Sequence, residues 1–131
     1  MKYTPADKDP LCKDEDGDPC CDNWNYRSIV GMMLYLAGIT RPNIAYAVHQ
    51  CARFSHSLKQ SHEIGVKHIA RYLKGTQTKG IILTPDKDNM RIDMFADADF
   101  TGLYTTEDKI DPVSVKIRTG VLLTFGNAPI L

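Results

Sequence analysis

The sequence predicts an α+β fold in which three helices precede a small, mostly antiparallel sheet. Between residues 25 and 76, apolar residues recur in three segments at the spacing of amphipathic helices. After Gly80 the spacing changes to the alternation of β-strands. The chain has 131 residues, 43% of them hydrophobic, which is enough for a modest core near the common size of a single domain.

The first helix is expected from about Tyr26 to Ala37. Aspartate and asparagine commonly cap a helix N-terminus, and Asp22, Asn23 or Asn25 can fill this position. Gly38 is expected to end the helix. Four apolar residues at helical spacing are expected to face the core: Ile29, Met32, Met33 and Leu36.

Two further helices are expected between Thr40 and Gly75. The second begins at Thr40-Arg41-Pro42, because proline is favoured in the first turn of a helix, and ends at Arg53-Phe54-Ser55. Its apolar stripe consists of Ile44, Ala47, Val48 and Cys51. The third has Ser61 as its N-cap, Glu63 in its first turn and Gly75 just beyond its end. Its core side carries Val66, Ile69, Ala70 and Leu73.

Positive charge is concentrated in this helical block. Residues 1–22 carry seven acids and three bases, residues 23–84 one acid and eight bases, and residues 85–131 eight acids and five bases. The formal net charge of zero therefore hides a central block that also holds all four histidines. On the third helix one side carries Lys67, Arg71 and Lys74, which we call the basic ridge. The block is a candidate surface for phosphates; the alternative is that its charges only occupy solvated faces.

Short strands are expected in the last third of the chain. Ile81-Ile82-Leu83 is expected to form a strand, and residues 85–89 a turn. The segment Ile92 to Phe100 alternates between two faces, as a half-buried strand does. Val115 to Phe125 is expected to form another strand or a bent pair that ends in a turn at Gly126-Asn127.

Two carboxylates, Asp97 and Asp99, fall on one face at the end of the strand Ile92 to Phe100. No later segment of the sequence predicts a helix that could cover the sheet, although its apolar side must be buried against another layer. We therefore expect a truncated sheet that is the weaker half of the chain. Self-association through its uncovered face is expected for the same reason.

Residues 1–22 are acidic and turn-rich, and they are expected to be a linker or to be ordered only by docking. The run Asp14 to Asp18 does not match a calcium loop, since its glycine comes too early. Cys20-Cys21 lacks the second pair that would complete a zinc site, and the four cysteines are expected to be reduced thiols. No apolar stretch is long enough to cross a membrane, and no signal peptide is recognisable. An intracellular location is expected, with cytoplasm and nucleus both open.

A set of short motifs extends over nearly the whole chain. They are Tyr26-Arg27-Ser28, Gly31, Leu34-Tyr35-Leu36, Thr40-Arg41-Pro42, Ile44-Ala45-Tyr46-Ala47-Val48, Arg53-Phe54, His62, Arg71-Tyr72-Leu73-Lys74-Gly75-Thr76, Gly80, Asp97-Ala98-Asp99-Phe100 and Thr119-Gly120. In order and spacing they resemble the Pol polyprotein of copia-type retrotransposons, at the end of the reverse transcriptase and the start of the ribonuclease H. Each motif alone is weak, but the set is highly specific.

The resemblance implies a domain organisation and a site. Residues 1–22 would be an acidic linker, residues 23–79 a three-helix thumb-like or connection region, and residues 80–131 the N-terminal part of a truncated ribonuclease H-like sheet. The helical part would grip an RNA–DNA hybrid or another nucleic-acid duplex through Arg41, Arg53, Lys67, Arg71 and Lys74. Asp97 is similar to the first metal-binding carboxylate of ribonuclease H, and Asp99 is a weaker candidate. In the intact parent enzyme such carboxylates would hold Mg²⁺.

Departures from the family pattern limit what the chain is expected to do. The sequence has no Tyr-X-Asp-Asp motif for polymerisation, and the later carboxylates of ribonuclease H are missing. One or two carboxylates do not hold a two-metal site, so no tight metal binding is expected. We expect an inactive fragment of a polyprotein whose parent copies RNA into DNA and cleaves RNA in hybrids. A non-catalytic nucleic-acid-binding helical module and a structural or interaction protein are the alternatives.

Overall fold

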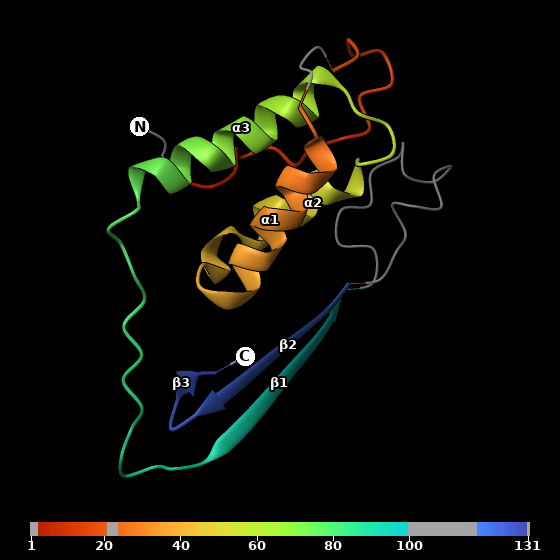
Figure 1. Ribbon diagram of the computed structural model, residues 1–131. Coiled ribbons are helices and arrows are strands. Elements are labelled where there is room, and N and C mark those ends of the chain that lie inside the picture. The colour runs from red at the N-terminus through yellow and green to blue at the C-terminus, as the bar shows by residue number, and fades with distance from the viewer. Residues whose placement is uncertain (1–2, 21–23, 100–117, 131) are drawn as a thin grey trace. The chain divides into compact units, whose positions relative to one another are not determined.

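Three helices and a three-stranded antiparallel sheet make up the described part of the chain, which confirms the predicted α+β class. The computed structural model describes residues 3–20, 24–99 and 118–130 (Figure 1). The chain divides into two units, residues 1–80 with the helices and residues 81–131 with the sheet. The assignment of these parts to a thumb-like bundle and a ribonuclease H-like sheet stays a prediction, as do the three domain ranges.

Helix α1 (Tyr26–Ile39) begins where the sequence predicted, because the Asn25 side chain accepts a hydrogen bond from the Ser28 amide at 3.1 Å. Gly38 does not end the helix, which continues to Ile39. The buried residues are Tyr26, Val30, Met33 and Ala37. Of the four core residues predicted for this helix, Met33 is buried, and Ile29 and Leu36 are partly buried and pack against the core. Only Met32, which is 60% exposed, was predicted wrongly.

A short 3-10 helix, η1 (Pro42–Ile44), leads into α2 (Ala45–Arg53), and Pro42 occupies the first turn as predicted. The predicted apolar stripe is confirmed, since Ile44, Ala47, Val48 and Cys51 are all buried. The Tyr26 hydroxyl donates a hydrogen bond to the Cys51 carbonyl at 2.9 Å and so joins α1 to α2. Burial raises the pKa of the Cys51 thiol to about 11, which keeps it protonated at neutral pH.

Helix α3 (Gln60–Gly75) buries Val66 and Ile69 as predicted, whereas Ala70 is exposed. Ser61 is not its N-cap: Lys59 occupies that position, and its amide donates to Nδ1 of His62 at 3.1 Å. Gly75 is the last helical residue, and Thr76 is the C-cap. The ring of His62 lies parallel to that of Phe54, with centroids 4.3 Å apart, and is fully buried.

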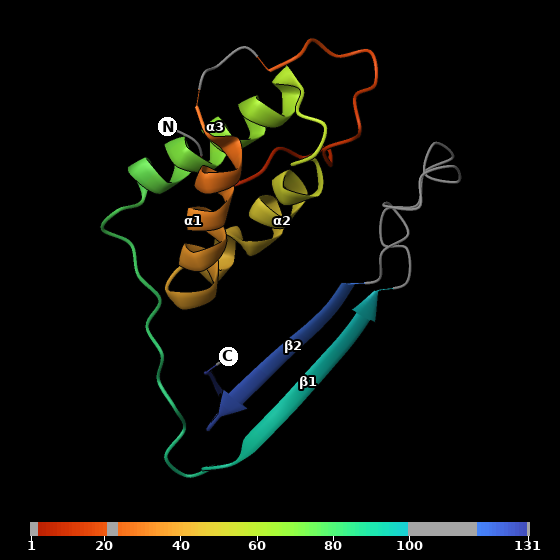
Figure 2. The same ribbon diagram turned by 45° about the vertical axis from the view of Figure 1, so that its right-hand side comes forward.

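Residues 3–20, which we call the strap, run alongside α3 in space (Figures 1 and 2). The backbone of the strap pairs with the start of α3, where the Gln60 amide donates to the Asp18 carbonyl at 2.9 Å. The Leu11 side chain packs against the helical core. Of the two predictions for this acidic segment, a free linker or a segment ordered by docking, the second fits residues 3–20. Cys12 and Cys51 are free thiols, the Cys20 thiol donates a hydrogen bond to Glu63, and Cys21 lies outside the described residues.

The sheet has the order β1-β2-β3, with β1 (Ile92–Asp99), β2 (Arg118–Phe125) and β3 (Ala128–Pro129) all antiparallel. The predicted turn at Gly126-Asn127 is confirmed. Both residues have positive φ, 54° and 65°, as tight hairpin turns favour. Phe100 and residues 115–117, which the predicted strands included, lie outside the described part of the chain.

The predicted strand at Ile81-Ile82-Leu83 is wrong, since these residues form no strand and Ile82 is 87% exposed. β-branched residues favour strands only where a partner strand supplies the hydrogen bonds, and none pairs with this segment among the described residues. On the sheet itself, large apolar residues are exposed on β1 and β2: Ile92, Met94, Phe95, Val121 and Leu122. Self-association through them stays a prediction. Within residues 3–20, 24–99 and 118–130, no helix is long and apolar enough to cross a membrane.

Replacing Tyr26 by Phe is expected to lower the free energy of unfolding by about 1 kcal/mol, because a buried hydrogen bond to the Cys51 carbonyl is lost while the ring remains. Urea unfolding followed by circular dichroism measures the difference. Tyr35→Phe is the matched control, since Tyr35 is exposed on the same helix and should tolerate the change. Equal stability of the two variants would contradict the role given to the Tyr26 hydroxyl.

Candidate nucleic-acid interface

The five predicted phosphate-binding residues divide into those that already have partners in the chain and those for which the described residues supply none. Arg41 lies just before η1 and points to the end of α3. Its guanidinium donates to the Thr76 carbonyl at 3.0 Å and to the Thr76 hydroxyl at 2.6 Å, and it lies 5.9 Å from the centre of the Tyr72 ring. It therefore anchors the C-terminus of α3, where backbone carbonyls lack helical partners. Phosphate contact by Arg41 stays a prediction.

Arg53, the last residue of α2, is half-buried. Its guanidinium lies 5.4 Å from the centre of the Phe54 ring and donates a long hydrogen bond, 3.4 Å, to the Gln50 side chain. The contact with Phe54 holds the Arg53 side chain against the end of α2. A phosphate contact would have to use the donors that point away from these partners.

The basic ridge of α3 is divided in the same way. Lys67 forms an ion pair with Glu63, which is buried and also accepts a hydrogen bond from the Cys20 thiol at 3.0 Å. The charge of Lys67 is thus largely neutralised by Glu63. Arg71 and Lys74 are exposed, and the structure records no hydrogen bond or ion pair for either side chain with the described residues. These two cations are available to a ligand.

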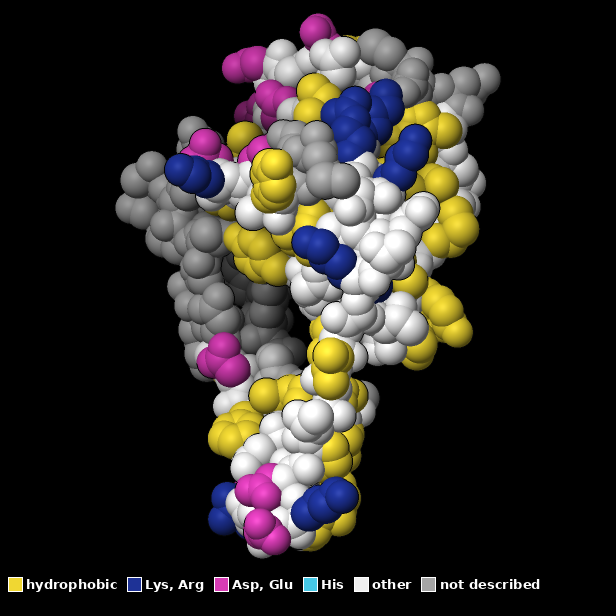
Figure 3. Space-filling view, turned by 90° about the vertical axis from the view of Figure 1, so that its left-hand side faces the viewer, with side chains coloured by type: hydrophobic (Ala, Val, Ile, Leu, Met, Phe, Trp, Pro, Cys, Tyr) yellow, Lys and Arg dark blue, Asp and Glu magenta, His cyan; other side chains and the backbone are white. Residues whose placement is uncertain are grey.

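Lys79 is a further exposed base that the sequence analysis did not select. Its amide donates to the Thr76 carbonyl at 3.1 Å, so it lies close to the end of α3. The signal was present in the sequence, because Lys79 belongs to the basic block, but it falls outside the helix whose periodicity defined the ridge. In the space-filling view, Lys and Arg side chains gather on the upper part of the face shown, with acidic side chains at its margin (Figure 3).

The predicted acidic site lies on β1. Asp97 is exposed and pairs across the sheet with Gly120, and Asp99 ends the strand opposite Arg118. In the part of the chain that the structure describes, no three His, Cys, Asp or Glu side chains gather closely enough to hold a metal ion. Asp97 therefore has too few neighbouring ligands among the described residues for a two-metal site. Metal binding by Asp97 and Asp99 stays a prediction.

A small cavity lies between the strap and helices α2 and α3. Its volume is about 40 Å³, and its lining includes Leu11, Gln50 and His68. The amide nitrogen of Gln50, which lines this cavity, is buried without a hydrogen-bond partner among the described residues. Such a space suits a buried water but is far too small for a nucleotide.

Comparisons with known proteins show what the chain is similar to. The retrovirus-related Pol polyprotein from transposon RE1 of Arabidopsis thaliana is 36% identical over 127 residues, which cover 97% of this chain and 8% of that protein. The corresponding polyprotein from transposon RE2 of the same plant is 33% identical over the same shares of both chains. The chain is a relative of the Pol polyproteins of copia-type transposons. It spans less than a tenth of the length of these two relatives.

A third relative of the chain has a name that does not mention Pol. Secreted RxLR effector protein 161 of Plasmopara viticola is 35% identical over 80 residues, which cover 61% of this chain and 56% of that protein. No model of a protein family matches the chain. No solved structure matches it either. The relationship to Pol polyproteins therefore rests on sequence similarity along almost the whole chain.

Replacing Arg41 by Ala is expected to lower the free energy of unfolding of the helical unit by about 1–3 kcal/mol, because the hydrogen bonds to Thr76 are lost. Arg41→Lys should also be less stable than the parent, since one ammonium cannot reproduce the forked hydrogen bonds of a guanidinium. Arg71→Ala is the matched control and should stay within about 0.5 kcal/mol of the parent. Urea unfolding measures all three, and an Arg41→Ala chain as stable as Arg71→Ala would refute the anchoring role.

Proposed function

We propose that residues 23–79 are the thumb or connection region of a retrotransposon reverse transcriptase, and that the sheet is the start of its ribonuclease H. The similarity to Pol polyproteins over 97% of the chain supports this, as does the order of a basic helical unit followed by an antiparallel sheet that carries Asp97. In the parent polyprotein such a region holds the primer and template. The function of the chain itself is weak binding of nucleic-acid duplexes.

The observation that carries this proposal is the state of the charges on α3. The basic block contains a single acid, Glu63, and that acid is buried and paired with Lys67. Arg71 and Lys74 consequently face solvent without a neutralising partner among the described residues. Exposed cations of this kind bind phosphates without reading bases, so the binding should depend on salt and not on sequence.

The strength of the salt dependence follows from the number of available cations. Arg71, Lys74 and Lys79 would make about three phosphate contacts, and the slope of log K against log salt should then be about −2 to −3 by counterion release. If Arg41, Arg53 and Lys67 also contact phosphates, the slope is steeper. The slope therefore separates exposed from internally paired bases.

Replacing both Arg71 and Lys74 by Ala is expected to weaken binding of an RNA–DNA hybrid and to make the slope shallower by about 2, because two ionic contacts are removed. Fluorescence anisotropy over a series of salt concentrations measures both quantities. The control is Lys87→Ala with Arg91→Ala, which removes the same charge from the segment before the sheet. The proposal fails if the two double variants bind the hybrid equally well at every salt concentration.

The sheet is not expected to cleave RNA. Mg²⁺, when bound in a ribonuclease H site, activates water and stabilises the leaving oxygen, and the donor set for this is a group of carboxylates. The described residues do not fit that requirement, because Asp97 stands on an exposed strand without a cluster of further ligands among the residues that the structure describes. In the proposed function, Asp97 is a remnant of the parent enzyme's metal site and has no catalytic role.

A labelled RNA–DNA hybrid incubated with the full chain and Mg²⁺ or Mn²⁺ is expected to stay uncut, because Asp97 lacks, among the described residues, the partners needed for two metal ions. Gel electrophoresis of the RNA strand measures this. Asp97→Asn is the control for contaminating nucleases. Cleavage by the parent chain that disappears in Asp97→Asn would show that the site is functional.

A further inference from the structure

The strap is held along α3 by contacts that a free linker would not make. Both buried histidines of α3 bind its backbone: Nε2 of His62 donates to the Cys12 carbonyl at 2.8 Å, and Nε2 of His68 donates to the Thr4 carbonyl at 2.9 Å. Nδ1 of His68 also faces the Asp7 carboxylate at 3.0 Å. Two histidines on one helix thus bind carbonyls eight residues apart in the strap.

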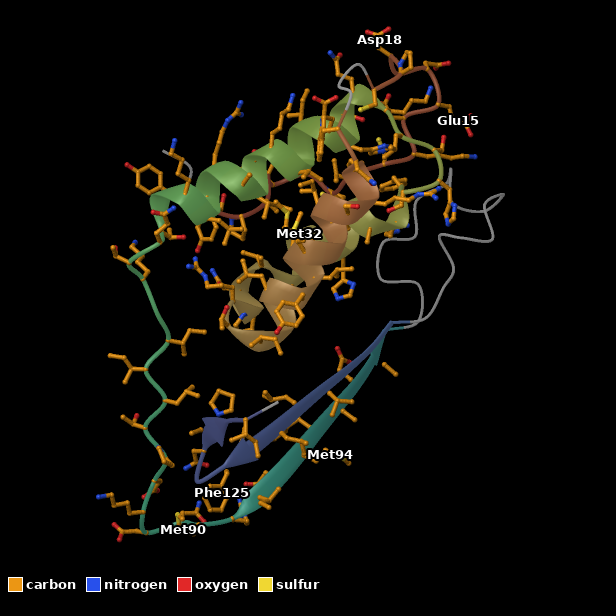
Figure 4. The ribbon with its side chains drawn as sticks, viewed as in Figure 1. Glu15, Asp18, Met32, Met90, Met94 and Phe125 are labelled. Carbon is orange, nitrogen blue, oxygen red and sulfur yellow. The ribbon has the colours of Figure 1, made fainter. Side chains whose placement is uncertain are left out.

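A second group of contacts holds the strap at the start of α3. The Lys59 ammonium donates to the carbonyls of Glu15 and Gly17, at 3.0 and 2.8 Å. The Ser61 hydroxyl donates to the Asp14 carboxylate at 2.5 Å. Figure 4 shows Glu15 and Asp18 in this part of the strap, near the first turn of α3. The strap therefore uses a cation of the basic block, Lys59, that a phosphate would otherwise reach.

The turn from Asp14 to Gly17 is built around these contacts. Asp14 has a φ of 52°, a conformation that costs free energy for a residue with a side chain, and its carbonyl accepts from the Gly17 amide at 3.1 Å. A Cβ added at Gly17 would come within 2.3–2.6 Å of the Asp14 carboxyl group. Only glycine at position 17 leaves room for the Asp14 carboxylate to reach Ser61.

The docked strap brings acids close to the available cations. Its described part carries six acids and two bases, so it is strongly negative. Asp7 touches His68, which precedes Arg71 by three residues, or about 4.5 Å along the helix axis. The Debye length at physiological salt is about 8 Å, so the strap's charge reaches the end of the basic ridge. A phosphate that approaches Arg71 meets the field of these carboxylates.

We propose that the strap and a nucleic-acid duplex compete for α3, so that the docked strap lowers the affinity of the helical unit for phosphate backbones. This inference rests on the proposed function and adds its regulation. The strap is tethered to the helix that it covers, which gives it a high effective concentration. Because coupling between two binding events is reciprocal, a bound duplex must in turn weaken the docking of the strap by the same factor.

Reciprocity is tested on the full parent chain. Lys8 and Lys13 are exposed strap residues at which trypsin cuts faster when the strap leaves α3. A saturating RNA–DNA hybrid is expected to raise the rate of these two cuts by about three-fold or more, measured by mass spectrometry of the N-terminal peptides. Cuts that are slowed or unchanged at saturation overturn the inference while leaving the proposed binding intact. A chain that does not bind the hybrid at all overturns both.

Gly17→Ala tests the same inference without a change of charge, because the added Cβ displaces the Asp14 carboxylate from Ser61. It should speed the strap cuts and tighten hybrid binding by about three-fold or more at low salt. Gly80→Ala is the matched control, since a Cβ there would meet none of the described residues within 4 Å. If Gly17→Ala releases the strap but binds like Gly80→Ala, the strap does not compete.

A charge variant covers the case in which Gly17→Ala leaves the strap in place. Asp9→Asn with Asp16→Asn removes two exposed strap acids that make no recorded side-chain contact with the described residues. Hybrid binding should tighten by about two- to four-fold at low salt. Asp86→Asn with Asp88→Asn, in the segment before the sheet, changes the net charge equally and should have a smaller effect. Equal effects of the two pairs would show that only net charge matters and would overturn the inference.

Discussion

The close approach of three segments at Gly65 is the constraint on which the helical unit depends. A Cβ at this position would lie 3.2 Å from the Leu11 side chain and 3.4 Å from the Cys51 sulfur. Because glycine has no side chain, α3 contacts both α2 and the strap at the level of Gly65. His62 and His68, three residues before and after Gly65, then bind strap carbonyls. The face of α3 that remains open is the one that carries Arg71 and Lys74.

The helices, the strand β1 and the turn at Gly126-Asn127 could be predicted because their signals are local. Periodic apolar residues, an asparagine cap and a proline in the first turn each act within a few residues. The docking of the strap could not be predicted in this way, since most of its contacts use backbone carbonyls, which every residue has. The prediction of a strand at Ile81-Ile82-Leu83 was wrong for a related reason. A strand also requires a partner strand, and the local sequence pattern does not identify one.

The candidate interface shows the same limit. Motif similarity selected Arg41 and Lys67 together with Arg71 and Lys74, and the structure separates them by their contacts with Thr76 and with Glu63. A base near a helix C-terminus also stabilises the helix dipole, so its presence alone does not establish a ligand. What distinguishes a phosphate contact from a structural base is whether the cation still lacks an internal partner.

The central claim is that duplex nucleic acid contacts the end of α3 and not the sheet. Amide spectra of the ¹⁵N-labelled full chain, recorded during titration with an RNA–DNA hybrid at low salt, test it most directly. The account predicts shifts at Arg71, Lys74 and Lys79 and in the strap, with the amides of β1 around Asp97 unchanged. Shifts confined to β1 and β2, or a spectrum of residues 60–80 that does not respond, would contradict it.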